Sequence, residues 1–195
     1  MHLLQRFLPE HQFSEQHQIR IDAAPGHVLD MVPRLDVADF PLVKLFMELR
    51  AVPARIAAAL GKPVGERRVD AGFGLHEFTP LGRDADRELA FGLIGRFWEP
   101  TAGLIRVNAD AFGAFSTPGV PKLVMTFVAE PDGAGTLLTT RTCVHCPDVA
   151  SRRRFTPYWL LIRLPSGLIR RTLLQRIKQL AEAPEPPAAP LTRPE

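Results

Sequence analysis

The sequence is poor in the features that stabilise small secreted domains or anchor a chain in a membrane. Its 195 residues include only two cysteines, Cys143 and Cys146, which are too few for a disulfide framework. No window approaches the roughly 20 uninterrupted apolar residues that a membrane span needs. The N-terminal residues show neither an apolar signal core nor a small-residue cleavage site. We therefore expect a cytoplasmic protein.

Motifs for cofactors, metals and nucleic acids are scarce as well. The chain has no Gly-x-Ser-x-Gly elbow, P-loop or Rossmann fingerprint. Cys143-Val-His-Cys146 has ligand types that suit zinc, but no second Cys or His pair accompanies it. Gly92 and Gly95 belong to a predicted strand, whereas a nucleic-acid-binding GxxG loop joins two helices. We expect no metal, no cofactor, no thioredoxin-like redox role and no nucleic-acid partner.

What the chain does contain is apolar content and an uneven charge. At 46% hydrophobic residues it can bury the core of one domain, which we place at residues 1–183. Residues 184–195 are proline-rich and are expected to be a disordered tail. Residues 151–182 hold eight basic residues and one acidic residue, so this segment carries +7 and the rest of the chain −4. A solvated helix face is the simpler interpretation; contact with a membrane surface through Arg152, Arg153 and Arg154 is the alternative.

The N-terminal part predicts a strand followed by two helices. Between Phe13 and Asp22, apolar and polar residues alternate, which is typical of a half-buried strand. Pro25 suits a first helical turn, and the apolar residues of 28–35 recur at helical spacing. A second helix is expected over residues 39–61, with Asp39 as its N-cap.

The central part, from Val69 to His145, predicts an antiparallel meander of six strands. Short apolar or alternating runs are separated there by turn residues at 80–84, 117–121 and 130–135. Such short connections favour antiparallel neighbours over βαβ units. The expected strands span residues 69–79, 87–95, 103–108, 111–116, 122–129 and 136–145.

One long amphipathic helix is expected to close the domain. It should begin after Asp148 and carry an apolar stripe from Tyr158 to Leu180. Pro165 lies in its middle and lacks the amide proton of a regular helical bond. The sequence therefore predicts a kink or break near Leu164.

This order, strand, two helices, six strands and a long helix, resembles the helix-grip architecture of the SRPBCC (START-like) superfamily, in particular an uncharacterised bacterial branch of it. The resemblance runs from about Phe7 to Glu182. It is carried by residues 7–10, 15–17, 23–25, 92–98, 112–115, 118–119, 154–155, 158–159 and 166–171. One departure is the last strand, where relatives tend to read Thr-Glu-Thr-Arg-Val and this chain reads Thr-Arg-Thr-Cys-Val at 140–144.

The resemblance implies an α+β fold in which a curved antiparallel sheet wraps around the C-terminal helix. Such a fold leaves a cavity between sheet and helix, where a small hydrophobic molecule of lipid, polyketide or isoprenoid type would bind. A cyclase or dehydratase acting on such a molecule is the enzymatic alternative, but the chain carries no motif that identifies it as an enzyme. A third hypothesis is docking to a membrane or a partner through the basic helix.

The candidate lining residues are mostly aromatic, because aromatic side chains form large apolar walls and methionine adapts to irregular ligands. The competing interpretation is that they simply fill the core. Polar side chains such as His76, Arg141 or Tyr158 would orient the ligand, and Asp70 and Glu77 are further titratable groups near the expected cavity; none is assigned a catalytic role. The full candidate set is Phe73, Leu75, His76, Phe91, Leu93, Phe97, Phe112, Phe115, Met125, Phe127, Arg141, Tyr158 and Leu161.

Overall fold

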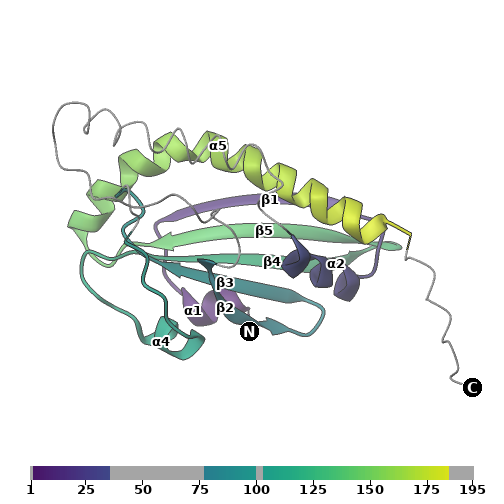
Figure 1. Ribbon diagram of the computed structural model, residues 1–195, viewed down its shortest axis with the longest axis horizontal. Coiled ribbons are helices and arrows are strands. Elements are labelled where there is room, and N and C mark those ends of the chain that lie inside the picture. The colour runs from purple at the N-terminus through teal and green to yellow at the C-terminus, as the bar shows by residue number, and fades with distance from the viewer. Residues whose placement is uncertain (1, 36–76, 100–102, 185–195) are drawn as a thin grey trace, which may run out of the picture.

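The protein is built on one antiparallel sheet, with a long helix and a short helical segment (residues 25–34) on one face and two short helices (residues 3–7 and 109–114) on the other (Figure 1). The computed structural model describes residues 2–35, 77–99 and 103–184. Within them the strands are β1 (Phe13–Ile21), β2 (Thr79–Asp84), β3 (Glu88–Ile94), β4 (Lys122–Asp132) and β5 (Gly135–His145), in the spatial order β1-β5-β4-β3-β2. The helices are α1 (Leu3–Phe7), α2 (Pro25–Met31), η1 (Val32–Arg34), α4 (Ala109–Ala114) and α5 (Val149–Glu182). The predicted α+β class and the long C-terminal helix are confirmed, and the arrangement is consistent with a helix-grip fold.

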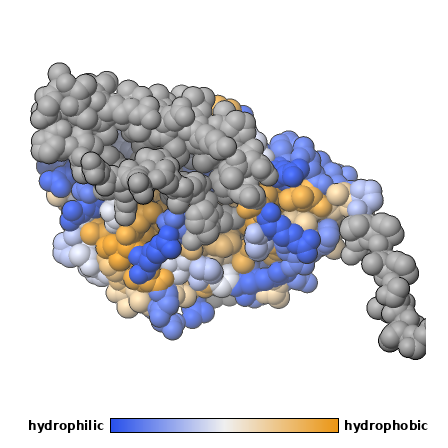
Figure 2. All heavy atoms as spheres, viewed as in Figure 1, coloured by the Kyte–Doolittle hydropathy of each residue, from blue (hydrophilic) through white to orange (hydrophobic). Residues whose placement is uncertain are grey.

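The alternation within each strand separates the two faces of the sheet. The face toward α5 and α2 buries Phe91 of β3, Met125 and Phe127 of β4 and Leu138 of β5 together with Leu174 of α5. The opposite face packs against α1 and α4, and its core residues are Leu3, Phe7, Leu8, Leu81, Ala90, Ile94, Phe112, Val120, Val124 and Cys143. A third cluster around Phe155 and Trp159 joins the start of α5 to the sheet. Figure 2 shows many hydrophilic side chains over the C-terminal part of α5.

Helix α5 begins as the sequence predicts. Asp148 is its N-cap and accepts a 2.7 Å hydrogen bond from the Ser151 amide, completing a capping box. The same carboxylate accepts a bond from the Gly119 amide, which ties the helix to the preceding turn. These backbone donors, Ser151 first, lower the pKa of Asp148. The cap thus fixes where the last strand ends and the helix starts.

Of the predicted kink or break near Leu164, the break is wrong, because α5 runs without interruption from Val149 to Glu182. Proline removes the hydrogen bond to the carbonyl of Leu161, four residues earlier. Leu161 is 71% exposed, so water can take the place of the missing donor. Figure 1 shows the helix arching over the sheet instead of ending.

Three other predictions need correction, and three more lie at least partly outside the described residues. Residues 111–116, expected as a strand, belong to helix α4, which Asn108 caps by accepting from the Ala111 amide at 2.8 Å. Residues 103–108 contribute one isolated bridge, Ile105 with Ile94. The segment 80–84, expected as a turn, lies in β2, and the chain turns at 85–87. The helix expected at 39–61, most of the strand at 69–79 and the tail 185–195 fall outside the described residues.

The remaining strands and turns follow the sequence. β1, β3, β4 and β5 agree with the predicted strands to within a few residues, and all described neighbours pair antiparallel. The turns before β4 and between β4 and β5 contain Gly119 and Gly133, with φ of +77° and +63°. Left-handed backbone of this kind favours glycine, which explains why those turns are legible in the sequence.

Candidate functional site

A cluster of polar side chains lies buried between the sheet and α5. Glu15 and His17 come from β1, Thr140 and Thr142 from β5, and Arg170 from α5. The strand register sets His17 opposite Thr140 and Glu15 opposite Thr142. The alternation that buries Ile21 on the same face of β1 therefore also carries a carboxylate and an imidazole inward. We call these five residues the polar cluster.

Charge interactions connect three members of the cluster. His17 Nε2 donates to Glu15 Oε1 at 2.8 Å, and Arg170 Nε lies 4.0 Å from Glu15 Oε2. The other end of the guanidinium reaches β4, where Nη1 lies 3.4 Å from Met125 Sδ. The exposed fractions of the Glu15, His17 and Arg170 side chains are 8%, 16% and 15%. A charged network is thus held largely away from water.

Several buried atoms of this network have no hydrogen-bond partner among the residues that the structure describes. They are Glu15 Oε2, Thr140 Oγ1, Thr142 Oγ1 and Arg170 Nε. A buried polar group without a partner costs roughly 1–3 kcal/mol, so four at one place are unusual. Burial lowers the pKa of Arg170 to about 10, against the opposing effect of Glu15, and the guanidinium remains charged at neutral pH. The cluster offers one cationic donor, one carboxylate oxygen and two hydroxyls to a further group.

Gly167 lets α5 approach the cluster closely. A Cβ at this position would lie 3.0 Å from Glu15 Oε1 and 3.5 Å from the His17 ring. Any larger residue would push the carboxylate aside, so glycine keeps space above the pair. Two segments that carry the family resemblance, 15–17 and 166–171, meet here.

Next to the polar cluster lies an apolar wall. The register continues the row from Glu15 through Thr142 to Met125 on β4 and Phe91 on β3. Phe127, in the neighbouring row, packs edge-on against Phe91, with ring centroids 6.2 Å apart. Polar and apolar surfaces therefore adjoin on one face of the sheet, an arrangement that suits a molecule with one polar end.

An open groove of about 620 Å³ runs along the β1 edge beside α5. Its β1 wall is formed by residues 16–19, and Arg171, Leu174 and Gln175 contribute the α5 wall. His17 belongs both to the groove and to the polar cluster. The volume of the groove lies within the roughly 300–1,000 Å³ common for ligand sites. The groove thus reaches the buried network at His17.

The structure brings together some of the predicted lining residues and separates others. Phe91, Met125 and Phe127 form one buried cluster beside the polar residues, and Leu93, Phe97 and Tyr158 lie in the cluster around Phe155. Phe112 and Phe115 pack on the opposite face of the sheet. Arg141 alternates with Thr140 and Thr142 and so also faces away from α5. Leu161 points to solvent on α5, and Glu77 accepts a 2.7 Å hydrogen bond from Arg106. Asp70, Phe73, Leu75 and His76 lie outside the described residues.

The sequence-based search missed all five residues of the polar cluster. The signal was present for Glu15, because it alternates with His17, Ile19 and Ile21 on the inward face of β1. Arg170 follows Ile169 in the helical stripe, but eight basic residues in this segment made it one among many. Only the three-dimensional arrangement distinguishes it from its exposed neighbour Arg171.

Both cysteines are free and buried, and the pKa of each thiol is raised. Burial raises the pKa of the Cys143 thiol, and burial and Asp148 raise that of Cys146 to about 11. Cys143 belongs to the cluster under α1 and α4, whereas Cys146 packs near Phe155. Within the described part of the chain, no three His, Cys, Asp or Glu side chains are placed to hold a metal ion. Nor does any helix described there have the length and apolar content to cross a bilayer.

No protein-family profile and no curated protein sequence matches this chain. Among solved structures it is similar to the di-domain ARO/CYC BexL from the BE-7585A biosynthetic pathway, with 14% identity and a TM-score of 0.36 over 89% of this chain. The chain spans about half of BexL, 51% of its length. It is also similar to TTHA0849 from Thermus thermophilus, with 9% identity and a TM-score of 0.29 over 87% of this chain and 97% of that one. Similarity at this level says nothing about a ligand or a reaction.

Proposed function

We propose that the protein binds a small, mainly apolar molecule between the sheet and α5, with a polar oxygen of the ligand on the polar cluster. The observation that carries the proposal is the set of four buried polar atoms without partners: Glu15 Oε2, Thr140 Oγ1, Thr142 Oγ1 and Arg170 Nε. A ligand hydroxyl could donate to Glu15 Oε2, and a hydroxyl or carbonyl oxygen could accept from Arg170 Nε, hydrogen bonds that the described residues leave open.

The apolar part of the ligand would rest against the wall of Phe91, Met125 and Phe127. These residues adjoin the cluster through the row that links Glu15 to Phe91. Burying apolar surface there contributes roughly 25 cal/mol per Å² and supplies most of the affinity. The polar cluster supplies orientation. A lipid-, polyketide- or isoprenoid-like molecule combines such an apolar body with a polar oxygen.

The test compares Arg170 with an exposed arginine on the same helix. The probe is 8-anilinonaphthalene-1-sulfonate, a fluorescent compound with an apolar body and an anionic group. We expect Arg170→Met to weaken its binding at least tenfold and Arg176→Met, a change at an exposed position, to leave it unaltered. Mass spectrometry of the denatured purified protein should also reveal a co-purified apolar compound. Equal probe affinity in wild type and Arg170→Met, at matched melting temperatures, would refute the proposal.

A second candidate function is acid–base chemistry on the same ligand, of the cyclase or dehydratase type. The observation in its favour is the 2.8 Å hydrogen bond from His17 to Glu15 in a largely buried setting. A carboxylate that orients an imidazole is a common arrangement for a general base. Poly-β-ketone thioesters are suitable probes: turnover should be lost in His17→Gln while probe binding persists. Absence of product with wild-type protein that binds the thioester would rule this candidate out.

The third candidate is docking to an anionic membrane surface. Arg152, Arg153 and Arg154 are exposed near the start of α5, and Leu160 and Leu161, at 65% and 71% exposure, follow on the same helix. Arginines beside exposed leucines suit a surface of anionic headgroups. Vesicles of phosphatidylserine and phosphatidylcholine should co-sediment with the protein at low salt and less so at high salt or after neutralisation of the three arginines. Equal sedimentation with purely zwitterionic vesicles would contradict it.

A further inference from the structure

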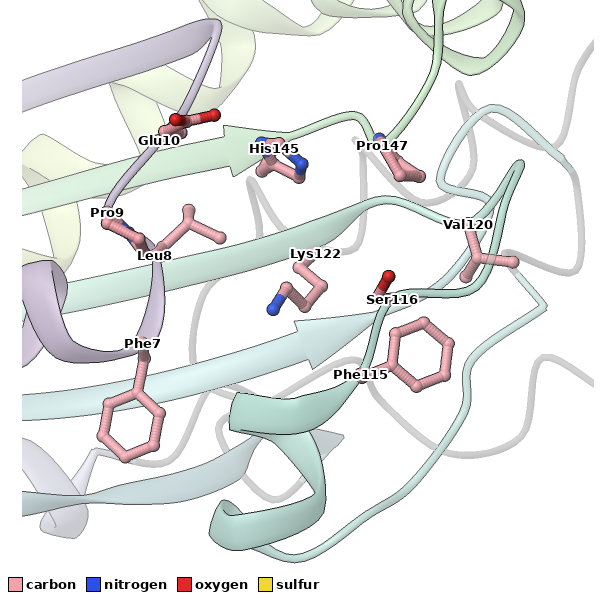
Figure 3. A pocket seen from close by; sticks show the side chains of 10 residues that line it. All are labelled: Phe7, Leu8, Pro9, Glu10, Phe115, Ser116, Val120, Lys122, His145 and Pro147. Carbon is pink, nitrogen blue, oxygen red and sulfur yellow. The ribbon is translucent and has the colours of Figure 1, made fainter.

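A second hollow lies on the opposite face of the sheet, away from α5. It has a volume of about 230 Å³ and is bounded by α1 and the residues after it, by the segment after α4, and by the adjoining ends of β4 and β5 (Figure 3). Its walls are mostly apolar, with Phe7 and Leu8 on one side and Phe115 and Val120 on the other. Two basic side chains, Lys122 and His145, complete it.

Lys122 is a half-buried cation for which the described part of the chain provides no ion pair. The side chain is half-buried, and its Nζ contacts only the carbonyls of Phe112 and Gly113, each at 3.5 Å, and the face of the Phe112 ring at 5.6 Å. Across the described ranges, no carboxylate lies within the 4.0 Å of an ion pair. Burial lowers the pKa of Lys122. The ammonium thus retains donor capacity that the protein does not use.

The neighbouring groups include a further permanent cation. The register pairs Lys122 with His145, and His11 lies near both His145 and Arg141. Burial first, and then Arg141 and His145, lower the pKa of His11, whose Nδ1 is itself buried without a partner. Glu10, the acidic residue that also borders the hollow, is exposed at its rim. The hollow therefore combines apolar walls with an unneutralised basic end.

We propose that this hollow is a second binding site, for a small organic acid whose carboxylate pairs with Lys122 and whose apolar body lies between Leu8 and Phe115. A carboxylate would give the ammonium a charge-assisted hydrogen bond, which is stronger than a bond between neutral groups. The volume falls below the roughly 300–1,000 Å³ of drug-sized sites, so the body is limited to about one ring. This site is separated by the sheet from the polar cluster and is independent of the function proposed there.

The test uses 4-fluorobenzoate, followed by ¹⁹F NMR titration of the full chain. Wild type should show saturable binding, and the neutral analogue 4-fluorobenzamide should bind at least tenfold more weakly. Lys122→Met should weaken binding of the acid at least tenfold, and Lys122→Arg should retain most of it. Two variants serve as controls that keep binding: Lys178→Met removes the other described lysine, on α5, and Arg170→Met disables the polar cluster.

Each of these binding measurements supports or contradicts the second site. Loss in Lys122→Met with retention in Arg170→Met supports it, and a preference for the acid over the amide supports it even if Lys122→Met fails to fold. Equal affinity for acid and amide, unchanged affinity in Lys122→Met, or loss of binding in Arg170→Met would overturn it. So would the absence of saturable binding to wild type at millimolar 4-fluorobenzoate.

Discussion

Two glutamates with largely buried side chains, one on each face of the sheet, differ in the hydrogen bonds that they accept. Glu88 is 2% exposed and accepts hydrogen bonds from the Leu3 amide at 2.8 Å, the Leu4 amide at 3.4 Å and the His2 ring at 3.3 Å. Glu15, on the face toward α5, accepts one bond from His17, and its second oxygen accepts no hydrogen bond from a described residue. Both carboxylate oxygens of Glu88 accept hydrogen bonds that anchor α1, whereas Glu15 keeps one oxygen that can still accept a hydrogen bond.

The comparison separates a structural charge from a functional one. A buried carboxylate whose oxygens are both satisfied holds two elements together and has nothing left for a ligand. A buried carboxylate beside an unsatisfied arginine and two unsatisfied hydroxyls costs stability unless another molecule completes it. Burial alone would have ranked the two glutamates alike.

The largest effect should come from removing Glu88. Glu88→Ala strands two backbone donors at the start of α1, each at a cost of roughly 1–3 kcal/mol. We expect the free energy of unfolding to fall by roughly 2–4 kcal/mol in urea denaturation, with probe binding at the polar cluster unchanged. A variant as stable as wild type would break the comparison.

Two glycines test the same contrast sterically. A Cβ on Gly92 would lie 2.5 Å from the buried Phe112 ring, so Gly92→Ala should cost roughly 1–3 kcal/mol through overpacking. Gly167→Ala meets Glu15 at 3.0 Å but gains about 0.5–1 kcal/mol of helix propensity. We expect its stability to stay within about 1 kcal/mol of wild type while probe affinity falls. Thermal unfolding and fluorescence titration measure both, and the reverse order of stabilities would contradict the packing argument.

Removing the charged pair should affect stability little. Replacing a buried ion pair by apolar residues is often neutral or stabilising, and Glu15 and Arg170 have imperfect partners in the unliganded protein. The double variant Glu15→Gln, Arg170→Met should therefore unfold at the same urea concentration as wild type, or a higher one, and lose probe binding. A loss as large as that of Glu88→Ala would make Glu15 a structural residue.

The smallest effect concerns the half-buried cap of α5, Asp148. Its pKa is lowered in the folded state from 3.8, so its contribution is present above that value and is lost as pH falls through the folded-state pKa. Asp148→Asn should lower the melting temperature by a few degrees at pH 7, and the difference should vanish at strongly acidic pH. A difference that persists there would mean that the carboxylate charge is not what stabilises the cap.

The sequence predicted those elements whose signals are local. The alternation of β1, the turns at Gly119 and Gly133 and the Asp148 cap each lie within a few residues, and these were located correctly. Residues 111–116 were predicted as a strand because apolar residues stand close together there. The structure shows that Asn108 begins a short helix, in which Ala111 and Ala114 fit well. A cap followed by alanines was the better guide.

The candidate site could be predicted only in part, because it depends on which elements pack together. The aromatic residues of β3 and β4 were expected to face the helix, and Phe91 and Phe127 do. The pairing of Glu15 with Arg170 joins residues far apart in the chain, and no local pattern specifies it. Nor does composition tell which glutamate, 15 or 88, finds enough donors.

Because the two thiols lie in different layers of the protein, the opening of each layer can be measured separately. Cys143 is enclosed with α1 and α4, and Cys146 with the start of α5, and both are held protonated at neutral pH by their raised pKa values. An alkylating reagent such as iodoacetamide can modify either one only after the surrounding layer opens. The two modification rates, resolved by peptide mass spectrometry, therefore time the opening of the two layers separately, without any engineered label.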